Sequence, residues 1–274
     1  MKNWKRSVFA AVVIPAVVFV YSRSLHRDFP SDFRDAPYDA PAAETLIIAA
    51  GQPAGTAAPE PVAAPAAAPS PVRTQRECRG PSFWRVIING FTDADKTNPP
   101  PEKAVLFLGS SSIRMWDLKK YFKDMPTINR GFGGSCISES AYFLNRIAAP
   151  YKPRLIVLYA GENDVADGKP VEQIVADFED FMLDMPKVPL IYLSIKPSPA
   201  RWGLWPKMRE ANVRLKASCG KQADCRFLDV SSVLLGEDGQ PRPELYHPED
   251  GGLHLNDQGY GLWAGLLAPL LEQH

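Results

Sequence analysis

The feature that most constrains the fold of this chain is a series of short apolar runs that do not alternate with polar residues. Four runs are rich in Val, Ile, Leu, Tyr and Phe, and a briefer one resembles them; they span residues 104–108, 127–129, 155–159, 190–195 and 226–230. Runs of this length without alternation are typical of strands that are buried on both faces, as in a parallel sheet. We therefore expect five strands in one mostly parallel sheet.

Amphipathic stretches lie between and after these runs and predict helices. They cover residues 113–122, 137–147, 171–183, 207–218 and 257–271. In 171–183 the apolar residues recur at helical spacing. This alternation of strands and helices predicts a doubly wound α/β fold, a five-stranded sheet flanked by helices. In such sheets, ligands bind beyond the carboxyl ends of the strands.

The N-terminal residues 1–24 differ in character from the rest of the chain. Lys2, Lys5 and Arg6 precede an apolar run over residues 8–21, which is the pattern of a secretory signal or a short membrane anchor. The run is shorter than the roughly 20 residues that span a bilayer comfortably. However, no small-residue cleavage site follows it. We therefore expect an uncleaved signal-anchor rather than a cleaved signal peptide.

Residues 25–77 are dominated by Ala and Pro and carry too little large apolar surface to order themselves, so we interpret them as a linker. The folded domain then covers residues 78–274. With the basic residues of the anchor held inside, we expect this domain to lie outside the cytoplasmic membrane, in a periplasmic or extracellular location. Lys and Arg together number 31, as do Asp and Glu, and this balance lacks the basic excess of nucleic-acid binders.

The four cysteines fit an oxidising compartment. Cys219 and Cys225 are close enough in sequence for a small disulfide loop, which leaves Cys78 and Cys136 as the second pair. Sequence alone does not fix the connectivity, and four free buried thiols are the alternative. Because the cysteine spacings do not resemble a zinc site, we expect no metal.

Polar clusters follow the predicted strands at the edge where ligands bind. They are Gly109-Ser110-Ser111-Ser112 after the first strand, Asn129 to Ser135 after the second, Gly161-Glu162-Asn163-Asp164 after the third, and Asp250 to Asn256 before the final helix. A serine at a helix N-terminus becomes nucleophilic only when a base takes its proton. His254 is the histidine best placed to do so. A glycine backbone N–H at Gly134 and the Asn163 amide would suit an oxyanion.

The ordered set of four clusters resembles the SGNH/GDSL hydrolases over about residues 104–271. Phe107 to Ile113 is similar to the first block of that family, and the other three clusters are similar to the second, third and fifth blocks. The resemblance implies a flavodoxin-like three-layer fold and a serine esterase without cofactor. It also implies Ser111 as nucleophile, His254 as base, and an oxyanion hole of the Ser111 and Gly134 N–H groups with the Asn163 amide.

Two positions depart from the family pattern. Ser110 stands where the Gly-Asp-Ser motif has aspartate. The family's acid lies three residues before the histidine, where this chain has Gly251, and Asp250 is one place further away. Either the loop bulges so that Asp250 still reaches His254, or a backbone carbonyl orients the imidazole; Glu249 is a weaker substitute. We expect Asp250 to be the acid.

The resemblance implies ester hydrolysis through an acyl-enzyme. Our first hypothesis is a hydrolase of acetyl or short acyl esters on envelope glycans or lipids. An acyltransferase that uses a sugar hydroxyl as acceptor would share the same intermediate. A non-catalytic envelope-binding domain is the alternative from another class, and the displaced Asp250 is the feature that favours it. Arg201 and Trp202, after the fourth strand, are either part of a surface loop or line the crevice for an anionic or sugar-bearing substrate.

Overall fold

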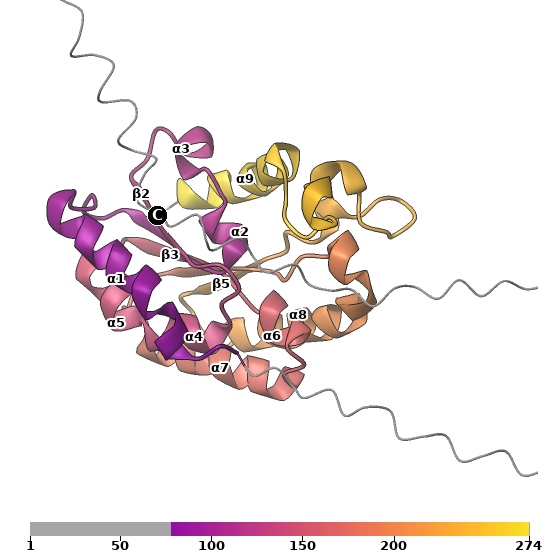
Figure 1. Cartoon of the computed structure of the whole chain (residues 1–274), viewed down its shortest axis with the longest axis horizontal. Coiled ribbons are helices and arrows are strands. Elements are labelled where there is room, and N and C mark those ends of the chain that lie inside the picture. Colours follow the sequence, from indigo (N-terminus) through magenta and orange to yellow (C-terminus); the bar gives the residue numbers. More distant parts are fainter. Residues whose placement is uncertain (1–77, 274) are drawn as a thin grey trace, which may run out of the picture. The chain divides into compact units, whose positions relative to one another are not determined.

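The computed structural model describes residues 78–273. A parallel sheet lies at their centre (Figure 1), and it has five strands. The strands are β1 (Val105–Gly109), β2 (Thr127–Gly131), β3 (Leu155–Tyr159), β4 (Leu190–Leu193) and β5 (Cys225–Leu228). Their order is β2-β1-β3-β4-β5, and every pairing is parallel. The predicted five-stranded parallel sheet is thus confirmed.

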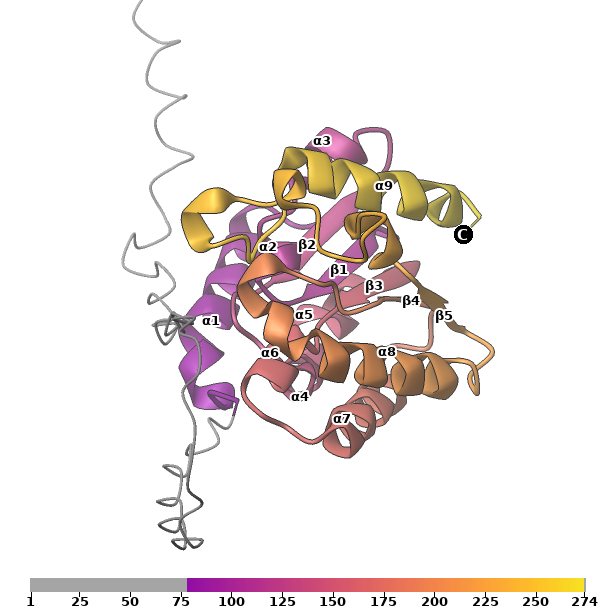
Figure 2. The ribbon, with the colours of Figure 1, turned by 90° about the vertical axis from the view of Figure 1, so that its right-hand side faces the viewer.

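Helices cover both faces of the sheet (Figure 2). One face carries α1 (Pro81–Thr97), α4 (Ile137–Tyr142), α5 (Leu144–Ile147), α6 (Glu162–Ala166), α7 (Val171–Asp184) and α8 (Trp205–Cys219). The other carries α2 (Ser111–Arg114), α3 (Leu118–Tyr121) and α9 (Asp257–Leu271). Short 3₁₀ helices complete the connections: η1 (Ala149–Tyr151), η2 (Pro199–Leu204), η3 (Ser232–Leu234), η4 (Pro243–Leu245) and η5 (Pro248–Asp250).

The central strands do not alternate in polarity because both of their faces are buried. In β1, Leu106 and Leu108 contact the core beneath α1, α4 and α7, whereas Val105 and Phe107 contact the core beneath α9. All four side chains are fully buried. Burial of successive residues on opposite faces therefore produces the apolar run seen in the sequence.

Several helices differ from their predictions. The stretch 113–122 forms the two short helices α2 and α3, because the Asp117 carboxylate accepts from the Lys120 N–H and starts a new helix. The stretch 137–147 likewise divides into α4 and α5 at Phe143. α1 and α6 were not expected. α1 buries Trp84 and Ile88, which lie four residues apart on one face of the helix.

Two disulfides connect the described cysteines, Cys78 with Cys136 and Cys219 with Cys225. This is the pairing that the sequence left open, and it excludes four free thiols. Within residues 78–273, no helix is long and apolar enough to cross a membrane. The expected signal-anchor over 1–24 and the linker over 25–77 lie outside the described residues.

Candidate active site

Ser111 begins α2 directly after β1, at the point where the strand order reverses between β1 and β3. Such a switch point opens the crevice in which doubly wound sheets bind ligands. Gly109 ends β1 with a φ of 128°, and a Cβ there would lie 1.8 Å from the Tyr159 carbonyl oxygen. Only glycine allows this close approach, which brings the Ser111 turn against the end of β3.

His254 contacts Ser111 from the loop before α9. Its Nε2 lies 2.8 Å from Ser111 Oγ, and the His254 side chain is almost completely buried. The His247 N–H donates to the His254 carbonyl at 2.9 Å, and Tyr246 pairs with Leu255 in an isolated antiparallel bridge. These backbone contacts fold the loop back to the sheet edge, as the sequence analysis expected.

Asp250 contacts the other nitrogen of the same imidazole. Its Oδ2 lies 2.6 Å from His254 Nδ1, whereas Glu249 lies 3.6 Å from His247 instead. The loop absorbs the extra residue at Gly251 and Gly252, whose φ values of 70° and 81° are left-handed. The Asp250 carboxylate also accepts from the N–H groups of Leu253 at 2.8 Å and His254 at 3.3 Å. The loop bulges, and Asp250 reaches the imidazole.

The electrostatics favour a neutral imidazole that carries its proton on Nδ1. Burial lowers the pKa of His254 below its usual value; the hydrogen bond to Asp250 opposes this shift, and the Lys196 charge adds to it. Although burial alone would raise the pKa of Asp250, hydrogen bonds from His254 and Leu253 hold it below its usual range. An ionised Asp250 accepts from Nδ1–H, which leaves Nε2 free to accept the Ser111 proton.

The three expected oxyanion donors come from α2, from the turn after β2 and from α6. The Ser111 N–H lies in the first turn of α2, where N–H groups have no acceptor within the helix. Gly134 has a φ of 78°, in the turn after β2. Asn163 lies in α6, and its Nδ2 donates to the Ser135 carbonyl at 3.0 Å, which ties α6 to that turn. An amide has two N–H groups, so a second donor remains on Asn163.

A buried ionic cluster contacts Asn163 and the loop before His254, and the sequence did not predict it. Lys196 is fully buried and donates to both carboxylate oxygens of Glu162, at 3.1 and 2.9 Å. Arg201 Nη1 lies 3.4 Å from Glu162 and donates to Asn163 Oδ1 at 3.0 Å. Trp202 stacks on Trp205. The available signal was Lys196 at the end of an apolar strand, where a lysine needs a buried partner.

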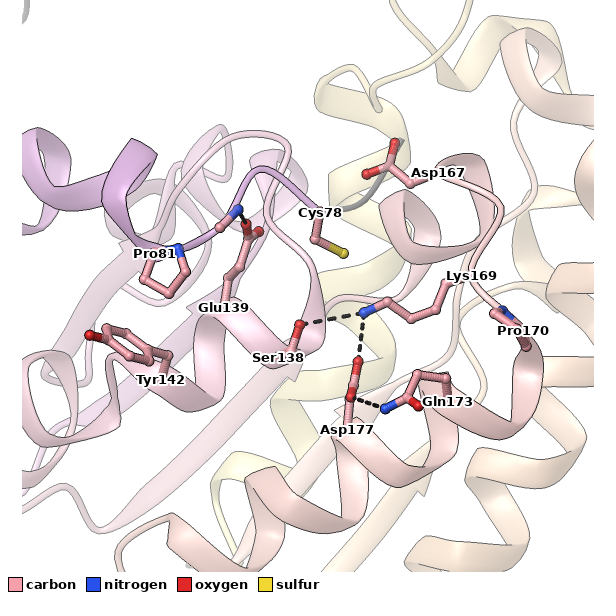
Figure 3. Close-up of a pocket in the computed structure, with 11 residues that line it drawn as sticks. Cys78, Pro81, Ser138, Glu139, Tyr142, Asp167, Lys169, Pro170, Gln173 and Asp177 are labelled. Atoms are coloured by element: carbon pink, nitrogen blue, oxygen red, sulfur yellow. Dashed lines mark hydrogen bonds and ion pairs between the residues drawn. The ribbon is translucent and has the colours of Figure 1, made fainter. Parts of the chain in front are cut away.

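A pocket of about 480 Å³ lies beside the start of α1, between α4 and the α6–α7 connection (Figure 3). None of the five expected site residues lines it. Its polar side chains bond to neighbouring protein groups: Glu139 accepts from the Gly80 and Cys136 N–H groups, and Lys169 donates to Asp164, Asp177 and Ser138. The pocket therefore does not include the contacting side chains of Ser111, His254 and Asp250.

Comparison with known proteins identifies a family for this chain. Residues 114–262, more than half of the chain, match the model of the GDSL-like lipase/acylhydrolase family. The match begins three residues after Ser111 and so does not include that serine, which the sequence resemblance singled out. No curated protein is significantly similar to the chain.

Solved structures share the fold at low identity. A protein from Streptococcus pneumonia whose name refers to platelet activating factor is 22% identical, with a TM-score of 0.62, over 70% of this chain and 94% of that chain. A GDSL-like lipase from Bacteroides thetaiotaomicron is 20% identical, with a TM-score of 0.59, over 68% and 97%. An acetyl-xylooligosaccharide esterase from Geobacillus Stearmophilus is 13% identical, with a TM-score of 0.52, over 62% and 94%.

Proposed function

The chain belongs to the GDSL-like lipase/acylhydrolase family, and from this we propose that it hydrolyses carboxylic esters with Ser111 as the nucleophile. The observation that carries the proposal is one continuous set of contacts, from Ser111 Oγ through the His254 imidazole to Asp250, with distances of 2.8 and 2.6 Å. This arrangement of nucleophile, base and orienting acid supports acyl transfer on any fold that builds it.

The reaction would proceed in two halves. Ser111 Oγ attacks the acyl carbonyl carbon while His254 Nε2 takes the hydroxyl proton. The tetrahedral oxyanion accepts from the Ser111 and Gly134 N–H groups and the Asn163 amide. The C–O bond to the alcohol then breaks, and His254 returns the proton to the leaving oxygen.

In the second half, water attacks the acyl-enzyme. His254 takes a proton from the water and passes it to Ser111 Oγ as the carboxylic acid leaves. Asp250 keeps the imidazole in the required tautomer and stabilises the imidazolium that forms in each half. Every proton that moves is thus accounted for by Ser111, His254, the alcohol and water.

We propose acetyl or short acyl esters, on envelope glycans or lipids, as the substrate class. The fold is shared with an acetyl-xylooligosaccharide esterase, which makes acetylated oligosaccharides the first substrates to test. The contact between Asp250 and His254 supports a catalytic domain over a non-catalytic one. A transferase would use the same acyl-enzyme, with a sugar hydroxyl in place of water.

The experiment is an activated acetyl ester assayed with the purified protein, with and without an acceptor sugar. We expect turnover that Ser111→Ala lowers by about 10⁴ to 10⁶ and that Ser110→Ala largely retains. Transfer of the acyl group to the sugar would identify a transferase. Covalent labelling by a fluorophosphonate that survives Ser111→Ala would refute the nucleophile.

We also propose that residues 1–24 anchor the protein, with residues 78–274 outside the cytoplasmic membrane. The basic flank of Lys2, Lys5 and Arg6 and the lack of a small-residue cleavage site support this proposal. We expect the protein purified from its own cells to fractionate with membranes and to retain its N-terminal residues. An N-terminus beyond residue 24 would instead identify a cleaved signal.

A further inference from the structure

We propose that Arg201 is a positioning residue that fixes the direction of the Asn163 side-chain amide, and that a buried Glu162–Lys196 pair holds Arg201 in place. The inference rests on the proposed function, because the Asn163 amide matters only if an oxyanion forms beside Ser111. The observation from which the inference starts is the hydrogen bond that the Arg201 guanidinium donates to Asn163 Oδ1.

The two partners of Asn163 permit one orientation of its amide. Arg201 Nη1 donates to Oδ1 at 3.0 Å, and the Ser135 carbonyl accepts from Nδ2 at 3.0 Å. A guanidinium only donates and a carbonyl only accepts, so a flipped amide would set donor against donor and acceptor against acceptor. Arg201 thus keeps the NH₂ group on the side of the Ser135 turn, where one N–H remains for the oxyanion.

Glu162 explains why the guanidinium lies there. Its carboxylate is almost completely buried, lies 3.4 Å from Arg201 Nη1, and belongs to the residue adjacent to Asn163 on α6. The Tyr159 hydroxyl donates to the same carboxylate at 2.7 Å. Against burial, which would raise it, the charges of Lys196 and Arg201 hold the pKa of Glu162 below its usual value. The carboxylate is therefore an anionic anchor for the guanidinium.

Lys196 connects this anchor to the other half of the site. Besides Glu162, its ammonium donates to the Leu253 carbonyl at 2.7 Å, one residue before His254. The contacts therefore run from the oxyanion amide, through Arg201, Glu162 and Lys196, to the loop that carries the base. A buried ion pair adds little stability compared with apolar packing, so a geometric role accounts for this cluster better than a stabilising one.

The burial of these residues predicts that Arg201 can be replaced without unfolding the domain. The Arg201 side chain is 22% exposed. Lys196 is fully buried and forms its ion pair with Glu162 without the help of Arg201. Arg201→Met therefore leaves the buried carboxylate compensated. The matched control is Arg209→Met, which removes an exposed arginine from α8.

The decisive experiment is a double-mutant cycle of Arg201→Met and Asn163→Ala in the full chain, with ester turnover as the readout. Loss of one oxyanion donor lowers kcat by about 10² to 10³. We expect Arg201→Met to lower kcat about 10-fold or more with little change in KM, Arg209→Met to be neutral, and the double variant to match Asn163→Ala alone. The inference would be overturned if the kcat losses of the two single variants multiplied in the double variant, or if Arg201→Met raised KM at constant kcat.

Arg201→Lys separates geometry from charge. Lysine keeps the positive charge near Glu162 but lacks the planar guanidinium that reaches Glu162 and Asn163 together. We expect it to lose nearly as much turnover as Arg201→Met. Full activity of Arg201→Lys would show that charge suffices and would contradict the positioning role.

A second readout does not depend on turnover. Hydrogen exchange of the Asn163 side-chain amide can be followed by NMR, with its resonances identified by their absence in Asn163→Asp. We expect faster exchange in Arg201→Met than in wild type or Arg209→Met, and equal exchange would refute the positioning role. If wild type hydrolyses no ester but this exchange still depends on Arg201, the proposed function fails, and only the structural part of the inference stands, namely that Arg201 orients the Asn163 amide.

Discussion

Asp250 lies four residues before His254, one place further than the family pattern, and yet its carboxylate contacts Nδ1 at 2.6 Å. The imidazole, the Leu253 N–H and the His254 N–H all lie within hydrogen-bonding distance of this one carboxylate. Glu249 instead lies beside His247, and its side chain is mostly exposed. We therefore propose Asp250, and not Glu249, as the orienting acid.

Asp250→Asn tests this assignment. An amide at position 250 can donate to Nδ1 and so favour the wrong tautomer, and in serine proteases the corresponding change costs about 10⁴ in turnover. We expect a marked loss of ester turnover with an unchanged thermal unfolding midpoint, a larger loss in His254→Ala, and little loss in Glu249→Gln. If Glu249→Gln is the damaging variant, the acid is misassigned; if both are neutral, the enzyme works with Ser111 and His254 alone.

The pH dependence of turnover follows from the His254 environment. Burial lowers the pKa of His254 below 6.5, and the base must be neutral to accept the Ser111 proton. We therefore expect kcat/KM to be constant at neutral pH and to fall with acidification around an apparent pKa below 6.5. Because the bond to Asp250 raises the pKa of His254, Asp250→Asn should move the acid limb to still lower pH. A midpoint above 6.5 in wild type would contradict this.

At the scale of elements, the loop from η5 to α9 carries both the acid and the base. Two consecutive left-handed glycines follow η5, and they supply the turn that the extra residue requires. They differ in their surroundings. A Cβ on Gly252 would lie 2.8 Å from Pro199 at the start of η2, whereas a Cβ on Gly251 would meet only Ala200 at 4.0 Å.

Alanine at each glycine should therefore have different effects on turnover. Both substitutions impose a left-handed backbone on a residue with a Cβ, at a cost of about 1 kcal/mol. Only Gly252→Ala also pushes the loop against Pro199, and a shift of about 1 Å in a catalytic group can lower turnover 10²-fold. We expect Gly252→Ala to lose at least about 10-fold more turnover than Gly251→Ala. Equal kcat values would show that the loop tolerates the displacement.

At the scale of the whole domain, the two disulfides close loops of very different length. Cys78 and Cys136 are 58 residues apart, and Cys219 and Cys225 are 6 apart. In the chain-entropy account, the longer loop constrains the unfolded chain more, by about 2 kcal/mol. We expect the free energy of unfolding in urea to fall further in Cys78→Ala/Cys136→Ala than in Cys219→Ala/Cys225→Ala. Equal losses would mean that native contacts, not loop length, decide the effect.

The strands were predictable because burial on both faces leaves its mark in each strand's own residues. The grouping of the polar clusters after the strands was also predictable, because parallel strands bring their carboxyl ends to one edge of the sheet. The position of α1 was harder to predict, because Trp84 and Ile88 become a buried face only against Phe132 and its neighbours in the core. The division of 113–122 into two helices depended on a single cap at Asp117.

The sequence by itself determined the sheet and singled out Ser111, His254 and the segments proposed to carry the oxyanion donors, because these features depend on residue types within short segments. The tertiary structure alone decided the contacts between segments. Arg201 meets Asn163 across 38 residues, and Lys196 meets Leu253 across 57. Such contacts depend on shifts of a few ångströms in where one loop lies relative to another. The bulge at Gly251 and Gly252, which brings Asp250 to His254, is one such difference.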